Sequence, residues 1–509
     1  MKLSFKNQTF EGKVPRLTKW LYTSSGMFRD ASYQFVSMFL LTYVQFCALG
    51  GVEFKDYLAM YGVISIIVII LRLWDGINDP IMGYIIEKCN FKCGKYRPWI
   101  IIGALLNSLV TIIMFWVNPT GWEYVIFFAI FYFLWDFTYT INDISFWSVL
   151  PSLSQEEKVR ANLTTTLSIF ISVGTFAVGG LVPLLSAGSQ ETTYKITSLV
   201  TSILFFLSQL ILVIFMKEKK MDDVVKASSK KIKLKEIFTV IFKNDQLRVS
   251  IIAILLFYAG SGILVAAGLN FFYFCYGYSI GGGYQFFFTV VFALATFAAQ
   301  LSYQPLVNKF KLSKMKIFTI MSIVTICAYM GLFLFIFVPN YITWFPLLCV
   351  LAFFAFFGQT IMSLIIYIMI QDTIDYNQYK FKERRESSIF SLRAFTAKLA
   401  GSIQQGILYL FLMASSLFAV SQNIANLERE FQGDSEYIKM QADLITGAQN
   451  IGLDQRVIFH IGFTIIPLLL FLGAFLIIKF KYKITEEYHE KMLAEIALRT
   501  IDSGSSGEK

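Results

Sequence analysis

The sequence has few charged residues for its length. Asp, Glu, Lys and Arg make up 15% of the 509 residues, compared with about 25% in soluble domains. Hydrophobic residues make up 56%, Phe alone occurs 52 times, and the mean hydropathy is +0.61. A water-soluble chain of this length could not bury that much apolar surface, which excludes soluble enzymes, nucleic-acid binders and secreted scaffolds. The chain is therefore interpreted as an integral membrane protein.

Histidine and clustered cysteine are scarce as well. The chain has two histidines, His460 and His489, which lie alone in the sequence. Of its six cysteines, only Cys89 and Cys93 are close together, and no second pair of Cys or His completes a zinc-binding pattern. No nucleophile–base pair can be proposed from these residues. We expect no cofactor and no catalytic centre, so the chain is not expected to be an enzyme.

Apolar runs of about 20 residues, the length that crosses a bilayer as a helix, recur along the whole chain. The short alternating strands of a transmembrane barrel are not seen. The sequence therefore predicts an all-α membrane protein with twelve transmembrane helices, at 30–50, 57–86, 98–117, 121–150, 163–186, 194–216, 249–275, 284–307, 315–338, 342–371, 388–420 and 457–480.

Lysine and arginine are unevenly divided between the two sides of these spans. The loops after even-numbered spans carry 24 of them, and the loops after odd-numbered spans carry five. Because basic residues concentrate in cytoplasmic loops, we expect both chain termini in the cytoplasm. The formal charge of +10 is then explained by these loops.

A polar, lysine-rich segment divides the spans into two sets of six. We predict a cytoplasmic N-terminal segment (1–29), a first six-helix bundle (30–216), a basic cytoplasmic linker (217–248) and a second six-helix bundle (249–480). The second bundle includes an acidic extracellular loop (421–456), and a cytoplasmic tail follows it (481–509). The extracellular loop is interpreted as an insertion, with a short surface helix or a lid as the alternatives.

The two halves share a weak internal repeat. Asp79-Pro80-Ile81-Met82-Gly83 follows the second span, and Gln304-Pro305-Leu306-Val307 follows the eighth, each before a basic loop. Parallel six-helix halves of this kind are typical of secondary transporters.

Ionisable side chains within the spans are candidate functional residues, because each is costly in hydrocarbon. Asp75 and Asp79 are four residues apart on one helix face, and they repel each other unless a cation or proton lies between them. Asn78 beside them and Thr140 in the fourth span add amide and hydroxyl oxygens, which hard cations prefer as ligands. We predict a monovalent-cation or proton site between these two spans. The alternative is a structural network in which Arg72 or another helix neutralises the acids.

Other polar residues indicate a solute site. Asp143, next to Asn142, and Trp147 are four residues apart on one helix face. A carboxylate can accept hydrogen bonds from sugar hydroxyls while an indole covers the C–H face of the ring; the alternative for the indole is ordinary packing. Arg29-Asp30 either joins this site or forms a self-satisfied pair at the start of the first span.

The eleventh span carries two basic residues, Arg393 and Lys398. A lone buried lysine would lose its proton, so a charged Lys398 requires an acidic partner. The candidate partners are Asp75, Asp79 and Asp143. Snorkelling toward an interface is the alternative.

Five stretches in both halves, in order along the chain, resemble the glycoside–pentoside–hexuronide:cation symporters of the major facilitator superfamily, the family of melibiose permease. They are Leu73-Trp74-Asp75-Gly76-Ile77-Asn78-Asp79-Pro80-Ile81-Met82-Gly83, Gly94-Lys95-Tyr96-Arg97-Pro98-Trp99, Tyr139-Thr140-Ile141-Asn142-Asp143-Ile144-Ser145-Phe146-Trp147-Ser148, Asp372-Thr373-Ile374-Asp375-Tyr376-Asn377, and Glu386-Ser387-Ser388-Ile389 through Lys398. The resemblance covers nearly the whole chain.

This resemblance implies the major facilitator fold, with twelve helices in two six-helix halves, and symport of a glycoside with Na⁺, Li⁺ or H⁺. Two family positions differ, since Ser168 stands where an arginine grips the sugar in melibiose permease and Ser363 where that relative has a tryptophan. The family cation site falls on Asp75, Asn78, Asp79 and Thr140. Its sugar site falls on Asp30, Asp143, Trp147, Arg393 and Lys398.

Our hypothesis from the sequence is a symporter of the bacterial inner membrane that imports a glycoside or short oligosaccharide by alternating access. Na⁺ is favoured over H⁺ because Asn78 and Thr140 would be unnecessary for simple protonation. The expected partners are the small-molecule glycoside and the lipid bilayer, without nucleic acid, and a monomer is compatible with the basic loops. A cation-coupled carrier of a lipid-like solute and a non-transporting membrane sensor are the alternatives.

Overall fold

The computed structural model describes residues 14–89, 91, 94–153, 157–216, 243–339, 342–383 and 386–505. Within these ranges the secondary structure is helical, apart from one isolated bridge between Phe91 and Gly94. The predicted all-α class is therefore confirmed. Most of the predicted basic linker, the first 13 residues and Cys93 lie outside the described residues.

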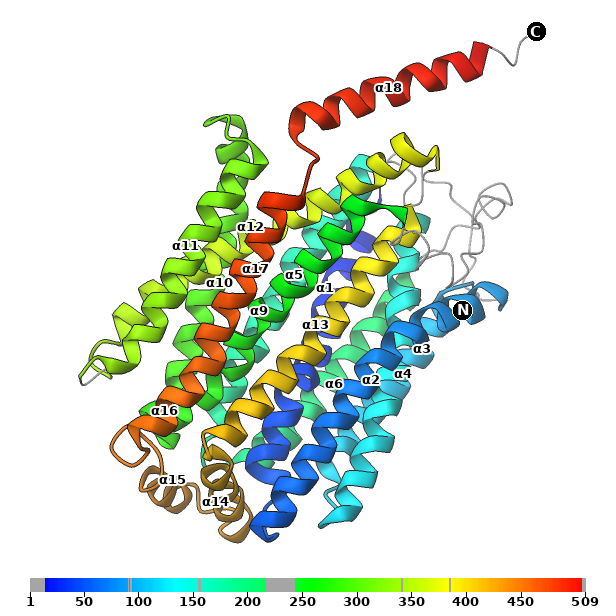
Figure 1. Cartoon of the computed structure of the whole chain (residues 1–509). Coiled ribbons are helices and arrows are strands. Elements are labelled where there is room, and N and C mark those ends of the chain that lie inside the picture. Colours follow the sequence, from blue (N-terminus) through cyan, green and yellow to red (C-terminus); the bar gives the residue numbers. More distant parts are fainter. Residues whose placement is uncertain are drawn as a thin grey trace. The chain divides into compact units, whose positions relative to one another are not determined.

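In the described part of the first half, the chain forms six long helices, which Figure 1 labels, and one short π-helix. Their bounds are α1 Arg16–Tyr43, η1 Val44–Ala48, α2 Phe54–Lys88, α3 Arg97–Trp116, α4 Trp122–Leu153, α5 Glu157–Ser186 and α6 Gln190–Phe215.

The described part of the second half adds further long helices and several shorter elements (Figure 1). Their bounds are α9 Asp245–Tyr276, α10 Tyr278–Asn308, α11 Lys314–Leu334, η2 Phe335–Phe337, α12 Phe345–Phe381, α13 Glu386–Ala414, α14 Leu417–Glu430, α15 Ser435–Asp443, α16 Leu453–His460, η3 Ile461–Ile465, α17 Ile466–Lys481 and α18 Glu486–Ser505.

Each predicted span coincides with a helix or with a run of consecutive helical segments. Ten helical segments of the described chain are long and apolar enough to cross a membrane, and α13 with α14 makes an eleventh if the bent pair counts as one span. The predicted first span falls on α1 and η1, where Arg29, Asp30 and several hydroxyl side chains lower the hydropathy.

The end of the eleventh span differs from the prediction. The apolar residues Leu417 to Val420 led us to extend this span to residue 420, but α13 ends at Ala414. Ser416 adopts a positive φ of 58°, and α14 then runs at 93° to the preceding helix. The apolar residues after this turn belong to α14, which begins the segment predicted as an extracellular loop.

The chain divides into two compact units. The first comprises residues 1–230, 278–286 and 419–445, and the second comprises 231–277, 287–418 and 446–509. Two short segments from the second half of the sequence therefore pack with the helices of the first half.

In the first unit, α1 packs against α5 and α6, while α4 packs against α2 and α3. The contact between α3 and α4 is close because Gly103 has no side chain: a Cβ there would lie 2.6 Å from the backbone nitrogen of Asn142. Small residues allow such approaches between membrane helices. The Asn142 side chain donates from Nδ2 to the Ile100 carbonyl, at 2.9 Å, so it fastens α4 to α3.

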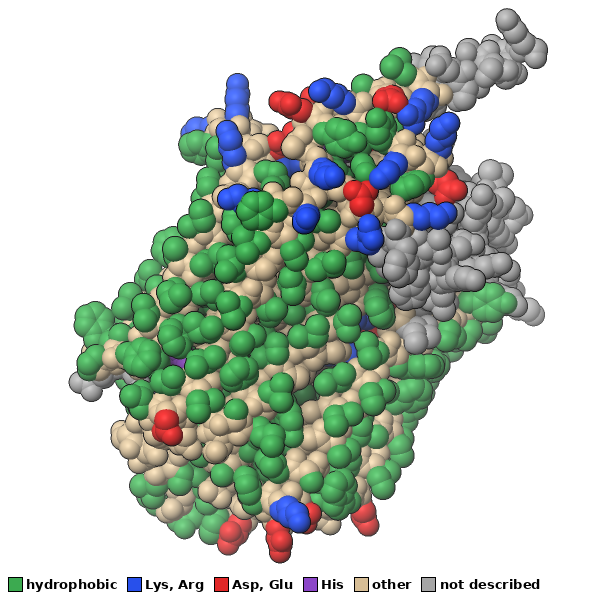
Figure 2. Space-filling model, in the orientation of Figure 1, with side chains coloured by type: hydrophobic (Ala, Val, Ile, Leu, Met, Phe, Trp, Pro, Cys, Tyr) green, Lys and Arg blue, Asp and Glu red, His purple; other side chains and the backbone are tan. Residues whose placement is uncertain are grey.

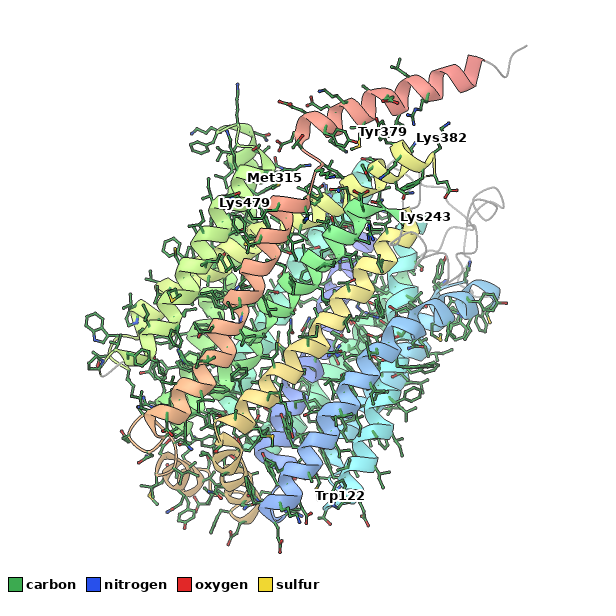
Figure 3. The ribbon with its side chains drawn as sticks, in the orientation of Figure 1. Trp122, Lys243, Met315, Tyr379, Lys382 and Lys479 are labelled. Carbon is green, nitrogen blue, oxygen red and sulfur yellow. The ribbon has the colours of Figure 1, made fainter. Side chains whose placement is uncertain are left out.

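In the second unit, α9 packs against α13 and α17, and α11 packs against α12. Figure 3 shows Lys243, Lys382 and Lys479 toward one end of this unit. Figure 2 shows Lys and Arg side chains gathered at that end, around α18, while hydrophobic side chains cover the long visible flank of α11 and α17. This division matches an apolar surface for lipid and a basic surface for water.

Candidate solute and cation sites

Arg29 is the centre of a charged cluster inside the first unit. Its side chain is 1% exposed, and Nη2 lies 2.8 Å from Oδ2 of Asp30. Nη1 lies 3.0 Å from Oδ1 of Asp143. Asp30 follows Arg29 on α1 whereas Asp143 belongs to α4, so one guanidinium joins the two helices. With both acids ionised, the cluster carries one net negative charge.

Aromatic rings fix the position of this guanidinium. Its central carbon lies 4.4 Å from the ring centroid of Phe146, 5.6 Å from that of Trp147 and 5.8 Å from that of Tyr139. All three rings come from α4, and cations are attracted to such ring faces. Tyr22 of α1 stacks on Phe146 at 4.5 Å. The Arg29 side chain is therefore held by ion pairs and by packing.

The cluster is open on one side. Asp143 is 37% exposed, whereas Asp30 is 14% exposed. Trp147 is also 37% exposed, and its spacing of four residues from Asp143 places both on one face of α4. The structure thus brings together three predicted solute-site residues, Asp30, Asp143 and Trp147, and leaves a carboxylate and an indole accessible side by side.

The predicted cation residues of α2 are buried. Asp75 is 6% exposed and Asn78 is fully buried, while Asp79 is half-buried. Within the described residues, neither Nδ2 nor Oδ1 of Asn78 has a hydrogen-bond partner. Buried amides are normally hydrogen-bonded, and an amide oxygen beside carboxylates suits a cation, so these residues fit a cation site.

Thr140 and Arg72 form hydrogen bonds with other residues. Thr140 is 3% exposed on α4, and its hydroxyl donates to the Asp136 carbonyl at 3.1 Å, which leaves the lone pairs of Oγ1 available to a cation. Arg72 donates to the hydroxyls of Tyr33 and Ser37 on α1, at 3.0 and 3.1 Å. These Arg72 bonds fasten α2 to α1.

The two basic candidates lie on α13, in the second unit. The Arg393 guanidinium lies 4.8 Å from the ring centroid of Tyr367 on α12, and Lys398 is half-buried. The pairing of Lys398 with acids of the first half stays a prediction.

A second charged cluster lies where α11, α12 and α18 meet. Lys314 pairs with Asp372, and the Tyr482 hydroxyl contacts Oδ2 of the same acid at 3.0 Å. His489 on α18 lies with Nε2 3.0 Å from Oδ2 of Asp375. Asp372 and Asp375 therefore hold the tail helix and the start of α11.

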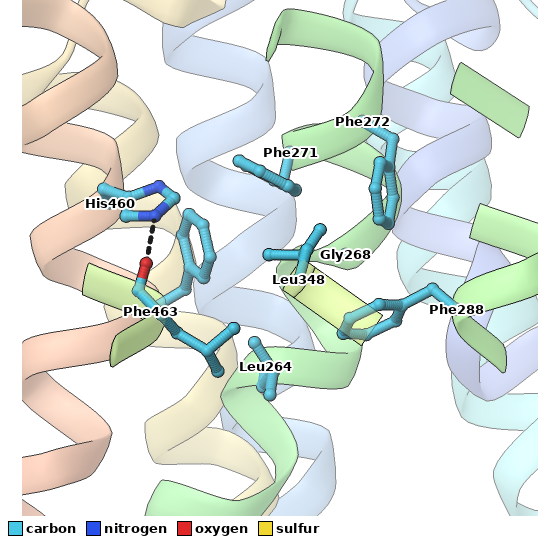
Figure 4. Close-up of a pocket in the computed structure, with 9 residues that line it drawn as sticks. Leu264, Gly268, Phe271, Phe272, Phe288, Leu348, His460 and Phe463 are labelled. Atoms are coloured by element: carbon cyan, nitrogen blue, oxygen red, sulfur yellow. Dashed lines mark hydrogen bonds between the residues drawn. The ribbon is translucent and has the colours of Figure 1, made fainter. Parts of the chain in front are cut away.

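A cavity in the second unit is unsuited to a sugar. It measures about 10 Å³, which is about the space that one water molecule needs. Its lining is apolar except for His460 (Figure 4), whose Nε2 lies 3.0 Å from the Leu332 carbonyl. None of the predicted site residues lines this cavity.

Sequence reasoning missed the central position of Arg29. The adjacent Arg29-Asp30 pair was a signal that the sequence offered, but the bond to Asp143 joins positions 114 residues apart, and no spacing within one helix indicates it. It also missed that His489 contacts Asp375. Within the described residues, no group of three His, Cys, Asp or Glu side chains is arranged to hold a metal ion.

The chain is similar in sequence to known sugar-transport proteins. The family model described as MFS/sugar transport protein matches residues 31–486. Lactose permease of Leuconostoc lactis is 25% identical over 498 residues, covering 93% of this chain and 70% of that protein. Raffinose carrier protein of Pediococcus pentosaceus is 26% identical over 396 residues, covering 74% of this chain and 59% of that protein.

The fold is shared with solved transporter structures. A bacterial homologue of the human lysosomal transporter Spinster superposes with a TM-score of 0.61 at 13% identity, covering 92% of this chain and 98% of that chain. The relatives are named permeases and carriers, and not enzymes. The chain therefore belongs to the MFS/sugar transport family, as a member of the glycoside–pentoside–hexuronide symporters with the major facilitator fold.

Proposed function

We propose that the protein is a symporter of a bacterial cytoplasmic membrane that imports a glycoside or short oligosaccharide together with Na⁺, with Li⁺ or H⁺ as the alternative ions. The observation that carries this proposal is the open side of the Arg29 cluster. A sugar ring has hydroxyl donors and an apolar C–H face, and the partly exposed carboxylate of Asp143 and indole of Trp147 complement both. Arg29, which is itself paired with Asp30, holds the Asp143 carboxylate in place.

The coupling ion would bind beside this cluster. Asp75 and Asp79 supply charge, and Asn78 and Thr140 supply neutral oxygens. The unpartnered amide of Asn78 supports Na⁺ over H⁺, because a carboxyl group needs no amide oxygen to take up a proton. Thr140 and Asp143 are three residues apart on α4, so a cation that shifts this helix would alter the solute site as well.

Solute and cation then strengthen each other's binding by the same free energy. We expect Arg393 and Lys398 to complete the solute site from the second half during alternating access. The substrates of the named relatives, lactose and raffinose, are the first solutes to test.

The proposal is tested by the melting temperature of the purified protein with lactose or raffinose, in NaCl or in choline chloride at equal ionic strength. A ligand at 100 times its Kd stabilises the native state by about 2.7 kcal/mol. We expect one of the sugars to raise the melting temperature and Na⁺ to enlarge the shift. Asp143→Asn should remove the sugar shift and keep the Na⁺ shift, whereas Asp75→Asn should remove the Na⁺ shift.

Uptake into proteoliposomes provides the second measurement. A Na⁺ gradient should drive uphill accumulation of the same sugar, and Asp75→Asn should abolish accumulation while the protein still folds. Glu123→Gln, at an exposed position of α4, is the matched control and should transport normally. Accumulation that survives Asp75→Asn would contradict the cation site. A lysolipid that stabilises the protein when no sugar does would instead favour a lipid-like solute.

A further inference from the structure

The two segments that join the first unit from the second half of the sequence meet each other there. They are the first residues of α10, Tyr278–Phe286, and the segment Ala419–Ile445, which includes most of α14. Both are covalently attached to helices of the second unit, through the rest of α10 and through α13. The contacts that hold these segments on the first-half helices therefore connect the two halves of the sequence.

One face of α14 lies against the first half. Ser421, Ile424, Ala425 and Glu428 are buried, at a spacing of three and four residues, whereas Asn423 on another face is exposed. Hydrogen bonds on this side of the helix join α14 to η1 and to the loop before α2. They are Gln45 Nε2 to Ser421 Oγ at 2.8 Å, Gln422 Nε2 to the Val52 carbonyl at 2.6 Å, and the Gly51 nitrogen to Asn426 Oδ1 at 2.7 Å.

A glycine lets the two backbones come close. At Gly50, a Cβ would lie 2.4 Å from the carbonyl oxygen of Ala425, so any side chain there would push α14 away. Arg429 donates from Nη1 to the Gly50 carbonyl. The loop is thus shaped to receive this one helix.

Glu428 is the buried centre of the contact. It is 2% exposed, and its Oε2 accepts a hydrogen bond from the Gln190 backbone nitrogen at 2.9 Å. Its Oε1 accepts from the Tyr278 hydroxyl at 2.5 Å, which in turn accepts from Gln190 Nε2 at 3.1 Å. These donors to the carboxylate are neutral groups. Burial is the main influence on this carboxyl, and it raises the pKa of Glu428 to about 7 although the donors oppose the rise.

We propose that this contact is a releasable clasp, in which α14 leaves the first-half loops during each transport cycle and the Glu428 bonds set how readily it leaves. Three features support release over permanent attachment. The interface contains several hydrogen bonds beside the apolar Ile424 and Ala425, and interfaces between parts that move are more polar than permanent ones. Irregular backbone adjoins both attached segments, at Ser416 with φ 58° and at Gly277 with φ 121°. Alternating access, on which this inference rests, requires the two halves to move relative to each other.

The first experiment needs no sugar. Ser421→Cys places a thiol on the buried face of α14, and Asn423→Cys places one on its exposed face. The rates at which a membrane-impermeant thiol reagent labels each cysteine are compared in a background without native cysteines. Adding Glu428→Ala should raise the Ser421→Cys rate at least tenfold, because Gln190 and Tyr278 lose their acceptor. The Asn423→Cys rate should change less than twofold.

Matched variants separate release from unfolding. Glu430→Ala removes a neighbouring exposed acid of the same helix and should leave both rates unchanged. Tyr278→Phe should raise the Ser421→Cys rate less than Glu428→Ala does, since Gln190 still reaches the carboxylate. Equal Ser421→Cys rates with Glu428 present and absent would overturn the role of Glu428. A rise of both rates together in Glu428→Ala would mean that the helix unfolds, which also overturns it.

The second experiment asks whether release is needed for transport. Val52→Cys with Asn426→Cys, joined by a short bifunctional thiol reagent, fixes α14 to the loop before α2. We expect this link to reduce Na⁺-driven lactose uptake at least tenfold and reduction of a cleavable linker to restore it. Trp116→Cys with Lys195→Cys is the control link, because Trp116 Nε1 contacts the Lys195 carbonyl at 3.1 Å within the first half.

The outcomes distinguish this inference from the proposed function. Normal uptake with the Val52–Asn426 link in place would show that α14 is a permanent attachment, and the clasp would be wrong. If the unlinked protein accumulates no lactose or raffinose, the proposed substrates are wrong, while the labelling rates still decide whether Glu428 holds α14 in place.

Discussion

The two charged clusters of the molecule use the same chemistry with different access to water. Arg29 pairs with two acids, one of which is 37% exposed. Lys314 pairs with Asp372, whose side chain is 6% exposed and is also contacted by Tyr482. The first cluster leaves a carboxylate free to meet a solute, whereas the second is covered by the tail helix and its neighbours.

This difference teaches that a buried charge is not by itself evidence of a binding site. Ion pairs buried on all sides contribute to the arrangement of helices, and their desolvation offsets much of their attraction. A site for a polar solute needs in addition an accessible hydrogen-bonding edge, and Asp143 with Trp147 provides one. Predictions that break each cluster separately can test this reading.

The largest effect is expected at Arg29. Arg29→Met keeps the volume of the side chain but leaves Asp30 and Asp143 without their shared cation. Removing one partner of a buried pair typically costs about 3–5 kcal/mol, so the melting temperature should fall by several degrees and the sugar-induced shift should vanish. Arg29→Lys should recover part of the stability. An Arg29→Met protein of normal stability that still binds sugar would contradict the central role of Arg29.

A smaller and purely structural effect is expected at Lys314. Lys314→Met should destabilise the protein by about 3 kcal/mol, at the low end of the range for buried pairs, because Asp372 keeps the contacts with Tyr482 and His489. The sugar-induced and Na⁺-induced shifts in melting temperature should keep their wild-type size. A lost sugar shift would mean that this cluster belongs to the solute site after all.

Trp147 isolates the open side of the first cluster. Trp147→Ala should weaken sugar binding about tenfold, or ~1.4 kcal/mol, with little change in the melting temperature without ligand, because the indole is 37% exposed. Trp122→Ala on the same helix, where the side chain is 48% exposed, is the matched control and should bind sugar normally. Equal sugar affinities of the two variants, measured by titration calorimetry, would show that Trp147 does not bind the sugar and serves only in packing.

The sequence was sufficient for the long helices because a bilayer imposes one rule on all of them: about 20 apolar residues form a helix. The same rule failed after Ala414, since Leu417 to Val420 continue the apolar run while Ser416 turns the chain. Hydropathy measures how apolar a segment is, so it does not reveal a change of chain direction at one residue.

The sequence proposed which residues form the candidate sites, but it did not predict their contacts. The motif around Asp75 and Asn78 identified residues that the structure finds buried in α2. The partners of Arg29 and Asn142 lie on other helices, and only the folded arrangement decides that Asp143 turns to Arg29 whereas Asn142 turns to α3. Neighbouring residues on one helix thus take different roles because they project at different angles.

The last prediction concerns Glu428, a buried acid whose carboxylate bonds are to neutral donors. Its pKa is about 7 in the docked state, compared with 4.5 for a free glutamate. Between pH 4.5 and pH 7, Glu428 is therefore protonated while α14 contacts the first-half loops and is ionised after α14 has left them. The equilibrium constant for binding of α14 to the first-half loops should be largest below about pH 4.5. It should fall by at most about tenfold per pH unit up to about pH 7 and stay constant above that pH.

The measurement is the labelling rate of Ser421→Cys divided by that of Asn423→Cys, which cancels the intrinsic pH dependence of the thiols. The ratio should rise from pH 5.5 to 7 and level off above that. Other titratable or charged groups near the carboxyl are Tyr278 on α10, Glu191 and Lys195 on α6, Cys47 on η1 and Arg429 on α14 itself. Glu428→Gln identifies the responsible group, because it alone should flatten the profile. A profile that persists in this variant would assign the pH dependence to one of those neighbours, and Glu428 would then resemble the closed Lys314 cluster in being structural.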